Sequence, residues 1–407
     1  MLEYLIIGAG VTGITLCKKL REKGIDNIVV LEALPEAGGL CRTRNIDGNV
    51  LDIGGGHFFH TKFSEVFDYV FQYIPKQEFN YIERISKIEI NGKTVDYPIE
   101  SNIWQLPKED QIEYIISVVR NGEALNKAEP SNYEEWIRWK LGEKICDEYM
   151  IPYNKKLWGV EPSGMDLDWL YKIPRVEVKE VLKYCLEQKQ DKNKFPAHIN
   201  FYYPKQGGFQ RIVDALVEAE KEKIVFNFKV EKLDYKNDRW IINDEFSAKN
   251  VINTTPWNDL YYALGEPVQL RDAFRKIKYN RIVISLCKHH YDTDWHWRYI
   301  PDMEKQHHRE FYIGNYAEDS KKCNIYTETE LMRFQENKAK RCFDIMESYI
   351  TDAAYPIPVL GHQKAIDTIL NYYKEKRLYG IGRWGQHSYQ NADVSMYEAI
   401  KFVENVL

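Results

Sequence analysis

The length, composition and charge of the chain exclude several broad classes of protein. With 407 residues it exceeds the roughly 250–300 at which a single hydrophobic core stops growing, so we expect more than one domain. Hydrophobic residues make up 44% and aromatic residues 14% of the chain, which argues against disorder. A formal net charge of −5 offers no long-range attraction for nucleic acid, so no nucleic-acid partner is expected.

The cysteine pattern points to a reducing compartment, and the hydropathy argues against a membrane span. The seven cysteines are scattered and show no CxxC spacing, so neither a disulfide framework nor a zinc site is indicated. No apolar run approaches the ~18 residues of a membrane span. The nucleotide motif described below begins so close to the first residue that it leaves no room for a signal peptide. These features predict a cytoplasmic protein without membrane insertion.

The N-terminal residues read as a βαβ unit. Residues 3–7 form a continuous apolar run typical of a buried strand, and residues 11–23 show the spacing of an amphipathic helix. Residues 27–31 read as a second strand, which ends at Glu32.

The middle of the chain changes from strand patterns to helix patterns and back. Residues 82–99 alternate around Asn91–Gly92, which predicts a hairpin with a type I′ turn. Helical spacing, punctuated by prolines, then appears over residues 110–120, 133–141 and 176–187. The later elements that we expect are a helix over 209–223, strands over 224–234, 240–242, 251–253, 281–287, 310–314 and 377–381, and a helix over 394–407.

These elements together predict an α/β fold whose nucleotide-binding part is discontinuous. We expect a Rossmann-type domain formed by residues 1–80, 203–255 and 375–407. A helical insert over residues 100–200 and a substrate domain with a mixed or antiparallel sheet, over residues 81–99 and 256–374, complete the chain.

The most informative short motif follows the first strand and opens the first helix. It reads GAGVTG over residues 8–13, and its glycines permit a tight turn and the close approach of a pyrophosphate to backbone N–H groups. Glu32, 19 residues after Gly13, can accept two hydrogen bonds from a ribose diol. The candidate cofactor-binding residues here are Gly8, Gly10, Val11, Thr12, Gly13 and Glu32. The alternative is a glycine-rich turn beside a surface glutamate.

Two further glycine-rich stretches favour FAD over NAD as the cofactor. The first, over residues 38–43, includes Gly39, Leu40 and Arg42 and can wrap a diphosphate from its other side. The second, over residues 52–57, includes Gly55, Gly56 and His57 and allows backbone to lie against a flat ring system. The alternative is that both are ordinary loops.

Two longer segments carry a resemblance to a known family. Residues 54–61 read GGGHFFHT and residues 153–159 read YNKKLWG. They resemble segments of the UDP-galactopyranose mutases, a branch of the flavin amine oxidase and protoporphyrinogen oxidase superfamily. The resemblance implies that Tyr153 stacks on uracil and Trp158 borders the sugar, whereas the alternative is a helix cap packed against the insert. We interpret Lys155–Lys156 as part of a solvated face.

The resemblance also implies roles for residues in later segments. Residues 172–175 read KIPR, in which Arg175 directly follows the proline rather than coming one residue later as in the family. Tyr203, before a Pro-x-Gly-Gly-like turn, either lines the active site or fills a hairpin. Val230 would hold the adenine through its backbone from within a strand. Arg309 would meet the substrate diphosphate bidentately.

The C-terminal third supplies the remaining candidates. Tyr355 resembles a tyrosine that places its phenol on the substrate phosphates, and Arg383 resembles an arginine near the flavin ring. Tyr389 belongs to a partly matching block. In this block either Asn391, toward the substrate, or Asp393, toward the cofactor, takes the family's role.

The function implied by the resemblance is a flavin-dependent nucleotide-sugar mutase. It would interconvert the pyranose and furanose forms of a UDP-sugar, UDP-galactose or a relative, through an adduct between flavin N5 and the sugar. The expected catalytic residues are His57, His60, Arg175, Arg309, Tyr355 and Tyr389. No acidic residue lies in a motif that suggests acid catalysis. Reduced FAD, an external reductant or NAD(P)H, a homodimer and a role in polysaccharide biosynthesis complete the expectation.

Other functions remain open at this point. An FAD-dependent amine oxidase or desaturase would need an apolar substrate tunnel, in which two arginines would be costly. A flavin-binding protein without catalysis is a third reading. The pairs His289–His290 and His307–His308 invite a metal site, but adjacent residues on a strand point to opposite faces, so no metal is expected.

Overall fold

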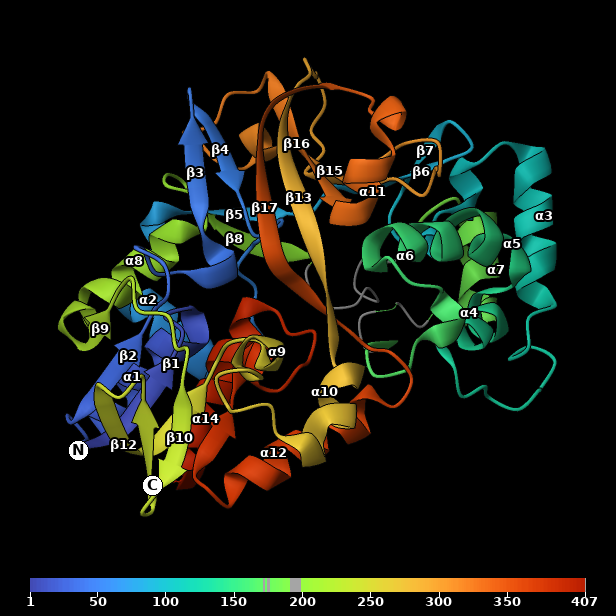
Figure 1. Ribbon diagram of the computed structural model, residues 1–407. Helices are drawn as coiled ribbons and strands as arrows, with labels where there is room; N and C mark the ends of the chain where they lie inside the picture. Colours follow the sequence, from blue (N-terminus) through green and yellow to red (C-terminus); the bar gives the residue numbers. More distant parts are fainter. Residues whose placement is uncertain (171–172, 174–175, 191–198, 407) are drawn as a thin grey trace.

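The computed structural model describes residues 1–170, 173, 176–190 and 199–406. It has three regions, which Figure 1 shows as a Rossmann-type layer at the lower left, a second sheet above it and a group of helices on the right. The fold class expected from the sequence, an α/β fold with a discontinuous Rossmann-type part, is confirmed.

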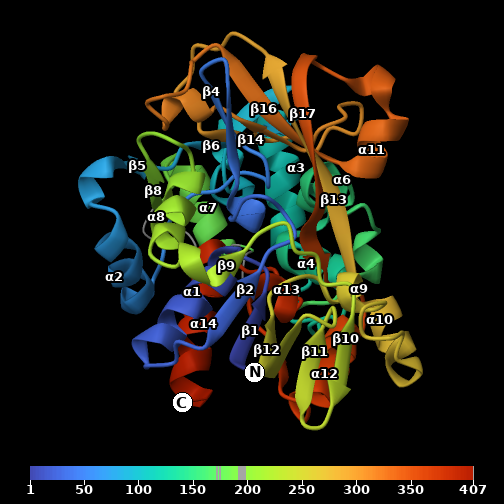
Figure 2. The same ribbon diagram turned by 60° about the vertical axis from the view of Figure 1, so that its left-hand side comes forward.

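The Rossmann-type sheet is built around β1 (Leu2–Ile7). This strand pairs in parallel with β2 (Ile28–Leu31) on one side and with β12 (Phe246–Asn253) on the other. The remaining strands are β9 (Ile224–Val225), β10 (Leu233–Lys236), β11 (Arg239–Ile242) and β18 (Leu378–Gly380), which pairs in parallel with β12. Helices α1 (Val11–Glu22) and α14 (Ala392–Val406) pack together, as Figure 2 shows, so the two ends of the chain meet in this layer.

The strand expected over residues 224–234 is wrong, because the chain leaves the sheet after Val225. Asn227 adopts a left-handed conformation with φ 56°, and the N–H of Phe228 then donates to the carbonyl of Glu32 at 2.8 Å. As a result β9 is the strand at one edge of the sheet and β10 is the strand at the other edge. Val230 therefore lies in the connection between these strands rather than within a strand.

The second sheet has the order β17-β13-β16-β15-β14-β6-β7. It is mixed, because β14 pairs with β6 in parallel while its other pairings are antiparallel. The β6–β7 turn has positive φ at Asn91 (48°) and Gly92 (73°), which confirms the type I′ prediction. The strands are β6 (Ser86–Ile90), β7 (Lys93–Asp96), β13 (Lys278–Lys288), β14 (Trp297–Tyr299), β15 (Arg309–Phe311), β16 (Asn324–Glu330) and β17 (Asp344–Ile357).

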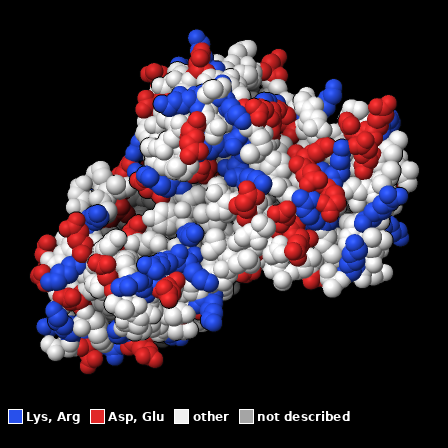
Figure 3. All heavy atoms as spheres, turned by 45° about the vertical axis from the view of Figure 1, so that its right-hand side comes forward, with Lys and Arg blue, Asp and Glu red and all other residues white. Residues whose placement is uncertain are grey.

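The helix expected over residues 133–141 is present in the helical region. The side chain of Asn132 accepts a hydrogen bond from the N–H of Glu135 and so caps α4, which runs over Tyr133–Leu141 as its apolar spacing predicts. The other insert helices are α3 (Lys108–Val119), α5 (Glu143–Ile145), α6 (Ile151–Trp158) and α7 (Val178–Glu187), with a π-helical turn over Cys146–Met150 between α5 and α6. On the face in Figure 3, acidic and basic side chains are intermixed over this region.

Shorter elements connect these regions. Two small antiparallel sheets pair β3 (Thr43–Ile46) with β4 (Asn49–Asp52) and β5 (Phe79–Glu83) with β8 (Asn200–Pro204). The remaining helices are α2 (Ser64–Tyr73), α8 (Gln210–Glu218), α9 (Trp257–Leu260), α10 (Arg271–Lys276), α11 (Leu331–Glu336), α12 (His362–Lys374) and α13 (Gly382–Gly385). Within the described ranges, no helix has both the length and the hydropathy to cross a bilayer.

The buried side chains form two large cores on either side of the Rossmann-type sheet. One core is continuous from α1 and α14 through the insert to the second sheet. The other core lies against the opposite face of the sheet and includes side chains of α10 and α12. Because one core joins all three regions, a cavity between them has rigid walls.

Candidate active site

A cavity of about 450 Å³ lies where the three regions meet. Its walls combine a glycine-rich loop, aromatic rings and several basic side chains, including Arg84, Arg309 and Arg383. Of the predicted site residues, those that line it are Gly55, Gly56, His57, His60, Tyr153, Arg309, Tyr355, Arg383, Tyr389, Asn391 and Asp393. Arg175 lies outside the described residues.

The turn after β1 has the geometry that the fingerprint predicts. Gly8 has φ 100°, and a Cβ atom on Gly13 would lie 2.0 Å from the carbonyl oxygen of Gly8. Gly10 precedes α1 as its N-cap, so the N-terminus of that helix is open to a phosphate. The Glu32 carboxylate is buried and accepts the N–H groups of Ala9 at 2.8 Å and Leu34 at 3.0 Å.

The other glycine stretches pack against each other. A Cβ atom on Gly54 would lie 1.9 Å from the carbonyl oxygen of Leu40, and one on Gly56 would lie 2.0 Å from the ring of Phe311. The Arg42 guanidinium donates to the carbonyl of Gly39 at 2.9 Å. The loop over residues 54–56 thus lies flat between two neighbours, and its cavity side is backbone.

Two histidines line the cavity beside this loop. Nδ1 of His57 lies 2.7 Å from the carbonyl oxygen of Gly55, and Nδ1 of His60 lies 2.8 Å from that of Asn200. Burial, together with the nearby Arg383, lowers the pKa of His57 to about 4. His57 is therefore neutral near pH 7. Because a carbonyl only accepts, Nδ1 carries the proton.

Arg309 lies opposite Glu328 in the register of β15 and β16. Its Nη2 lies 3.6 Å from Oε1 of Glu328 and donates to the hydroxyl of Tyr355 at 3.4 Å. The Tyr355 hydroxyl donates to the same carboxylate at 2.7 Å. Burial alone would raise the pKa of Glu328, but Arg309 and His308 hold it at about 2. The carboxylate is therefore ionised and compensates the buried guanidinium.

Glu328 is a functional candidate that sequence reasoning missed. No acidic residue stands in a recognisable motif, and Glu328 is one of two glutamates near the end of an alternating strand. Only the pairing of β15 with β16 brings it to Arg309. Only a prediction of which residues of these two strands lie opposite each other could have identified Glu328 from the sequence.

Aromatic side chains and Arg383 form further parts of the cavity wall. Tyr153 lines the cavity, and its ring centroid lies 5.4 Å from that of Tyr299. Trp158 is fully buried behind this wall, where its Nε1 donates to Oδ1 of Asn154 at 3.0 Å. Arg383 donates to the carbonyls of Gln390 at 2.7 Å and Ala354 at 3.0 Å, so it ties the ends of two segments together.

The sequence left two interpretations of Tyr203 open, and it left open whether Asn391 or Asp393 takes the family's role. Tyr203 is buried outside the cavity lining, and its hydroxyl donates to Asp52 at 2.8 Å, so the packing interpretation describes its position. Asn391 and Asp393 both line the cavity at the N-terminus of α14.

The interpretation of Lys155–Lys156 as a solvated face is wrong for Lys156. This side chain is 1% exposed, and its Nζ donates to the carbonyls of Ile300 at 2.8 Å and Asp302 at 2.7 Å. Successive helical residues lie about 100° apart, so Lys155 reaches Glu161 at 2.7 Å on the outside while Lys156 points inward. Burial lowers the pKa of Lys156 to about 6.

Replacing Lys156 by methionine is expected to change how stability depends on pH. The folded chain holds this pKa below the value of about 10.4 in an unfolded chain. Between about pH 6 and about pH 10 the unfolded state then binds more protons, so the wild type gains stability as pH rises, by at most about 1.4 kcal/mol per unit. Urea unfolding at several pH values measures this.

The methionine variant should lack this gain and should lose about 1–3 kcal/mol at high pH, because two buried carbonyls lose their donor. Lys155→Met, which removes the outward lysine, is the matched control. A constant difference between wild type and Lys156→Met across the range would contradict the prediction.

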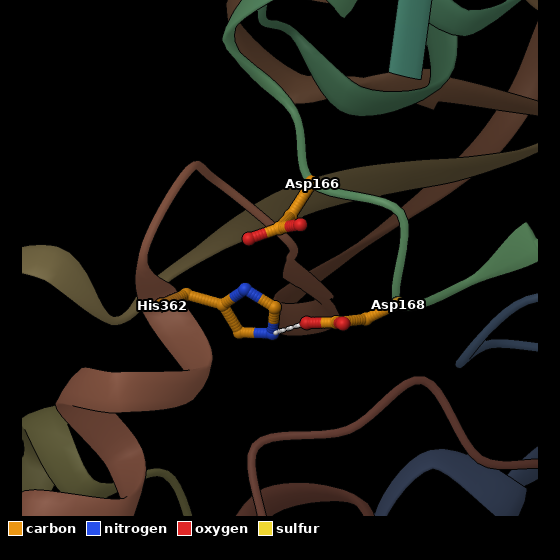
Figure 4. A group of neighbouring side chains, drawn as sticks. All are labelled: Asp166, Asp168 and His362. Atoms are coloured by element: carbon orange, nitrogen blue, oxygen red, sulfur yellow. Dashed lines mark ion pairs between the residues drawn. The ribbon is translucent and has the colours of Figure 1, made fainter. Parts of the chain in front are cut away.

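A second cluster of polar side chains joins the insert to α12. Figure 4 shows Asp166 and Asp168 facing His362. Nε2 of His362 lies 3.2 Å from Oδ2 of Asp168, and its Nδ1 lies 3.1 Å from the carbonyl oxygen of Val359. The three side chains each offer one potential metal-ligand atom within 4.8 Å of one another. The ion pair and the backbone contact explain their approach, so we interpret them as a clasp between the two segments.

His307 and His308 lie just before β15 rather than on a strand, and their rings contact different carboxylates. Nε2 of His307 lies 2.9 Å from Glu310, whereas Nε2 of His308 lies 3.2 Å from Glu328. Each ring therefore binds a different carboxylate.

The chain is similar to known proteins in both sequence and structure. Residues 6–73 match the family model of an NAD(P)-binding Rossmann-like domain. Over all of its residues the chain is 23% identical to a probable UDP-galactopyranose mutase of Klebsiella pneumoniae, of which it covers 94%. The crystal structure of a reduced UDP-galactopyranose mutase superposes with a TM-score of 0.88 at 23% identity, covering all of this chain and 94% of the other.

Amine oxidases share the architecture at greater distance. Cyclohexylamine oxidase of Brevibacterium oxydans superposes with a TM-score of 0.66 at 12% identity, over all of this chain and 99% of the oxidase. The chain therefore has the fold that UDP-galactopyranose mutases share with flavin amine oxidases, and its resemblance to the mutases extends over its whole length.

Proposed function

We propose that the chain is an FAD-dependent isomerase that interconverts the pyranose and furanose forms of a nucleoside-diphosphate sugar, UDP-galactose or a close relative. The observation that carries the proposal is the cavity itself. It brings a backbone-lined glycine loop within one enclosure with two arginines, Arg309 and Arg383. A flat cofactor and a diphosphate therefore have complementary walls in the same site.

The residues present fit FAD. The fingerprint glycines, Val11 and Thr12 open α1 toward a pyrophosphate, and Glu32 stands at the end of β2 where a ribose would lie. Gly54 and Gly56 permit no side chain on the loop that would face the ring system. Residues 38–42, Arg383 and Asp393 would complete the cofactor site, with Val230 beside the adenine. When bound and reduced, FAD would supply a nucleophile for the anomeric carbon of the sugar.

The chain's own residues would hold the departing diphosphate. Arg309 offers a planar guanidinium already oriented by Glu328, and the Tyr355 and Tyr389 hydroxyls stand beside it. Arg175 is proposed for the same task from its motif. Neutral His57, whose Nδ1–H donates to Gly55, presents an unprotonated Nε2, so it can accept a hydrogen bond without adding charge beside the flavin loop.

An amine oxidase is the alternative, because more distant structural relatives carry that activity. A substrate ammonium group would enter a cavity that already holds the positive charges of Arg309 and Arg383. Only the first of these has a carboxylate within ion-pair distance in the described part of the chain. Like charges in an enclosed site repel, so the cavity favours an anionic substrate.

The test is turnover of UDP-galactofuranose by the purified flavoprotein, with and without prior reduction by dithionite. We expect UDP-galactopyranose to form only with reduced enzyme, because only the reduced flavin would be nucleophilic. Since the net isomerisation consumes no electrons, one reduction should support many turnovers. NAD(P)H should replace dithionite if it is the physiological reductant. If no sugar nucleotide isomerises, while an amine bleaches the oxidised flavin and yields peroxide in air, the oxidase alternative replaces the mutase.

A further inference from the structure

The cavity has a second end that the mechanism above does not use. Away from the glycine loop it is lined by side chains of the insert and of the turn after β7, namely Tyr97, Pro98, Glu100, Leu141 and Tyr149. Two aromatic rings separate this end from Arg309. Its guanidinium lies 5.8 Å from the ring centroid of Tyr299, which lies 5.2 Å from that of Tyr97.

Glu100 is the one carboxylic acid at this end. It lies in a short 3-10 turn, Ile99–Ser101, and is 5% exposed. Among the described residues, no lysine, arginine or histidine forms an ion pair with it. Lys140 acts on it electrostatically, but its Nζ is already 2.6 Å from Glu123. Within the described part of the chain, Glu100 thus lines the cavity without a cation paired to it.

Apart from Lys140, and from Arg84, which lies 4.8 Å from the ring centroid of Tyr97, the other described groups around Glu100 are weakly acidic or apolar. Tyr97 and Tyr149 interact with it electrostatically. Helix α7, which also packs on this turn, buries Val181 and Tyr184. Burial raises the pKa of Glu100 to about 7, against the opposing effects of its own backbone N–H and of Lys140. Both protonation states are therefore accessible near neutral pH.

The protonation state decides which base such a group can recognise. A protonated carboxyl presents one donor beside one acceptor, and a carboxylate presents two acceptors. Uracil offers an N–H flanked by carbonyls, which pairs with the protonated form through two hydrogen bonds. The edge of guanine with adjacent N1–H and amino donors pairs with the ionised form. A carboxylate facing the carbonyls of uracil would be repelled.

We propose that Glu100 binds the base of the substrate nucleotide as a protonated carboxyl group and so selects uracil over guanine. This inference rests on the proposed function, because it assumes that a nucleoside diphosphate lies with its phosphates at Arg309. The rings of Tyr153 and Tyr149, 5.7 Å apart between centroids, flank the path and offer a stacking surface for the base.

The experiment measures the affinity of oxidised holoenzyme for UDP-glucose and GDP-glucose by calorimetry between about pH 6 and about pH 8.5, on either side of the folded pKa. Diphosphates esterified at both ends do not titrate there. We expect UDP-glucose to bind about tenfold or more weakly at the high end, because the bound form requires the proton. Its binding near pH 7 should take up roughly half a proton per site, seen by comparing buffers of different ionisation enthalpy.

Glu100→Gln separates this effect from other titrations. The amide keeps one donor and one acceptor, so the variant should bind UDP-glucose at high pH as tightly as wild type does at low pH, without proton uptake. Glu109→Gln, on the exposed start of α3, is the control and should behave as wild type.

A flat pH profile for wild type, pH dependence that survives in Glu100→Gln, or no binding of UDP-glucose overturns the inference. If Glu100→Gln does not fold, two wild-type measurements test the inference. UDP-glucose binding should weaken as pH rises, and GDP-glucose binding should show the opposite trend. Proton-linked binding without isomerase turnover would leave this inference standing and reject the mutase. Isomerase turnover together with UDP-glucose binding that does not change with pH would support the mutase and reject this inference.

Discussion

Replacing Arg309 by methionine is expected to lower kcat/KM for isomerisation by about 10²- to 10³-fold, the usual loss when a donor to a developing charge is removed from an enclosed site. In the proposed function this guanidinium meets the diphosphate as it leaves. Methionine keeps much of the volume and removes the charge. The measurement is turnover by reduced enzyme under limiting substrate. Arg309→Lys should recover only part of the activity, because an ammonium cannot form the planar bidentate contact.

The same change leaves the Glu328 carboxylate buried without its cation. Breaking a buried pair in this way typically costs about 3–5 kcal/mol of unfolding free energy. The double variant Arg309→Met with Glu328→Gln removes both charges, so it should regain most of the stability and none of the activity. A double variant that regains activity would show that Arg309 matters for packing alone, and would remove it from the proposed machinery.

Replacing Gly54 by alanine is expected to abolish flavin retention. Its Cβ atom would lie 1.9 Å from the carbonyl oxygen and 2.7 Å from the Cα of Leu40. Both are backbone atoms, so a rotamer change cannot relieve the clash and the two loops must separate. The loops on either side of the proposed ring site then lose their spacing. Overpacking of this kind costs about 1–3 kcal/mol.

The flavin-to-protein absorbance ratio after gel filtration measures retention, and urea unfolding measures stability. Gly164→Ala is the control, because a Cβ atom there meets nothing within 4 Å and its backbone is not left-handed. Wild-type flavin content in Gly54→Ala would show that residues 38–42 do not contact the cofactor.

Much of the fold could be predicted because its signals are local. Asn132 can cap only the residues that follow it, so α4 starts at Tyr133 as expected. Asn91–Gly92 both tolerate positive φ, which fixes the turn between β6 and β7. The prediction of a continuous strand over residues 224–234 failed because the point where the chain leaves the sheet depends on a contact between Phe228 and Glu32, which are far apart in sequence.

The candidate site was predictable where the chemistry lies within one motif. The glycine loop with His57, and Tyr153 on α6, line the cavity as their segments suggested. Glu328, Glu100 and Lys156 were missed for a common reason. Each is buried by partners far away in sequence, and a lone charged residue looks like a surface residue until those partners are known.

The order of strands in the Rossmann-type sheet has a consequence for synthesis on the ribosome. Leu5 of β1 pairs with Val251 of β12, so a long stretch of chain must be made before β1 gains its second neighbour. At about 5–20 residues per second, the nascent βαβ unit waits on the order of 10 to 50 seconds with one hydrophobic strand edge open. During that interval the edge is available to a chaperone, or to the same strand of another nascent chain on a polysome.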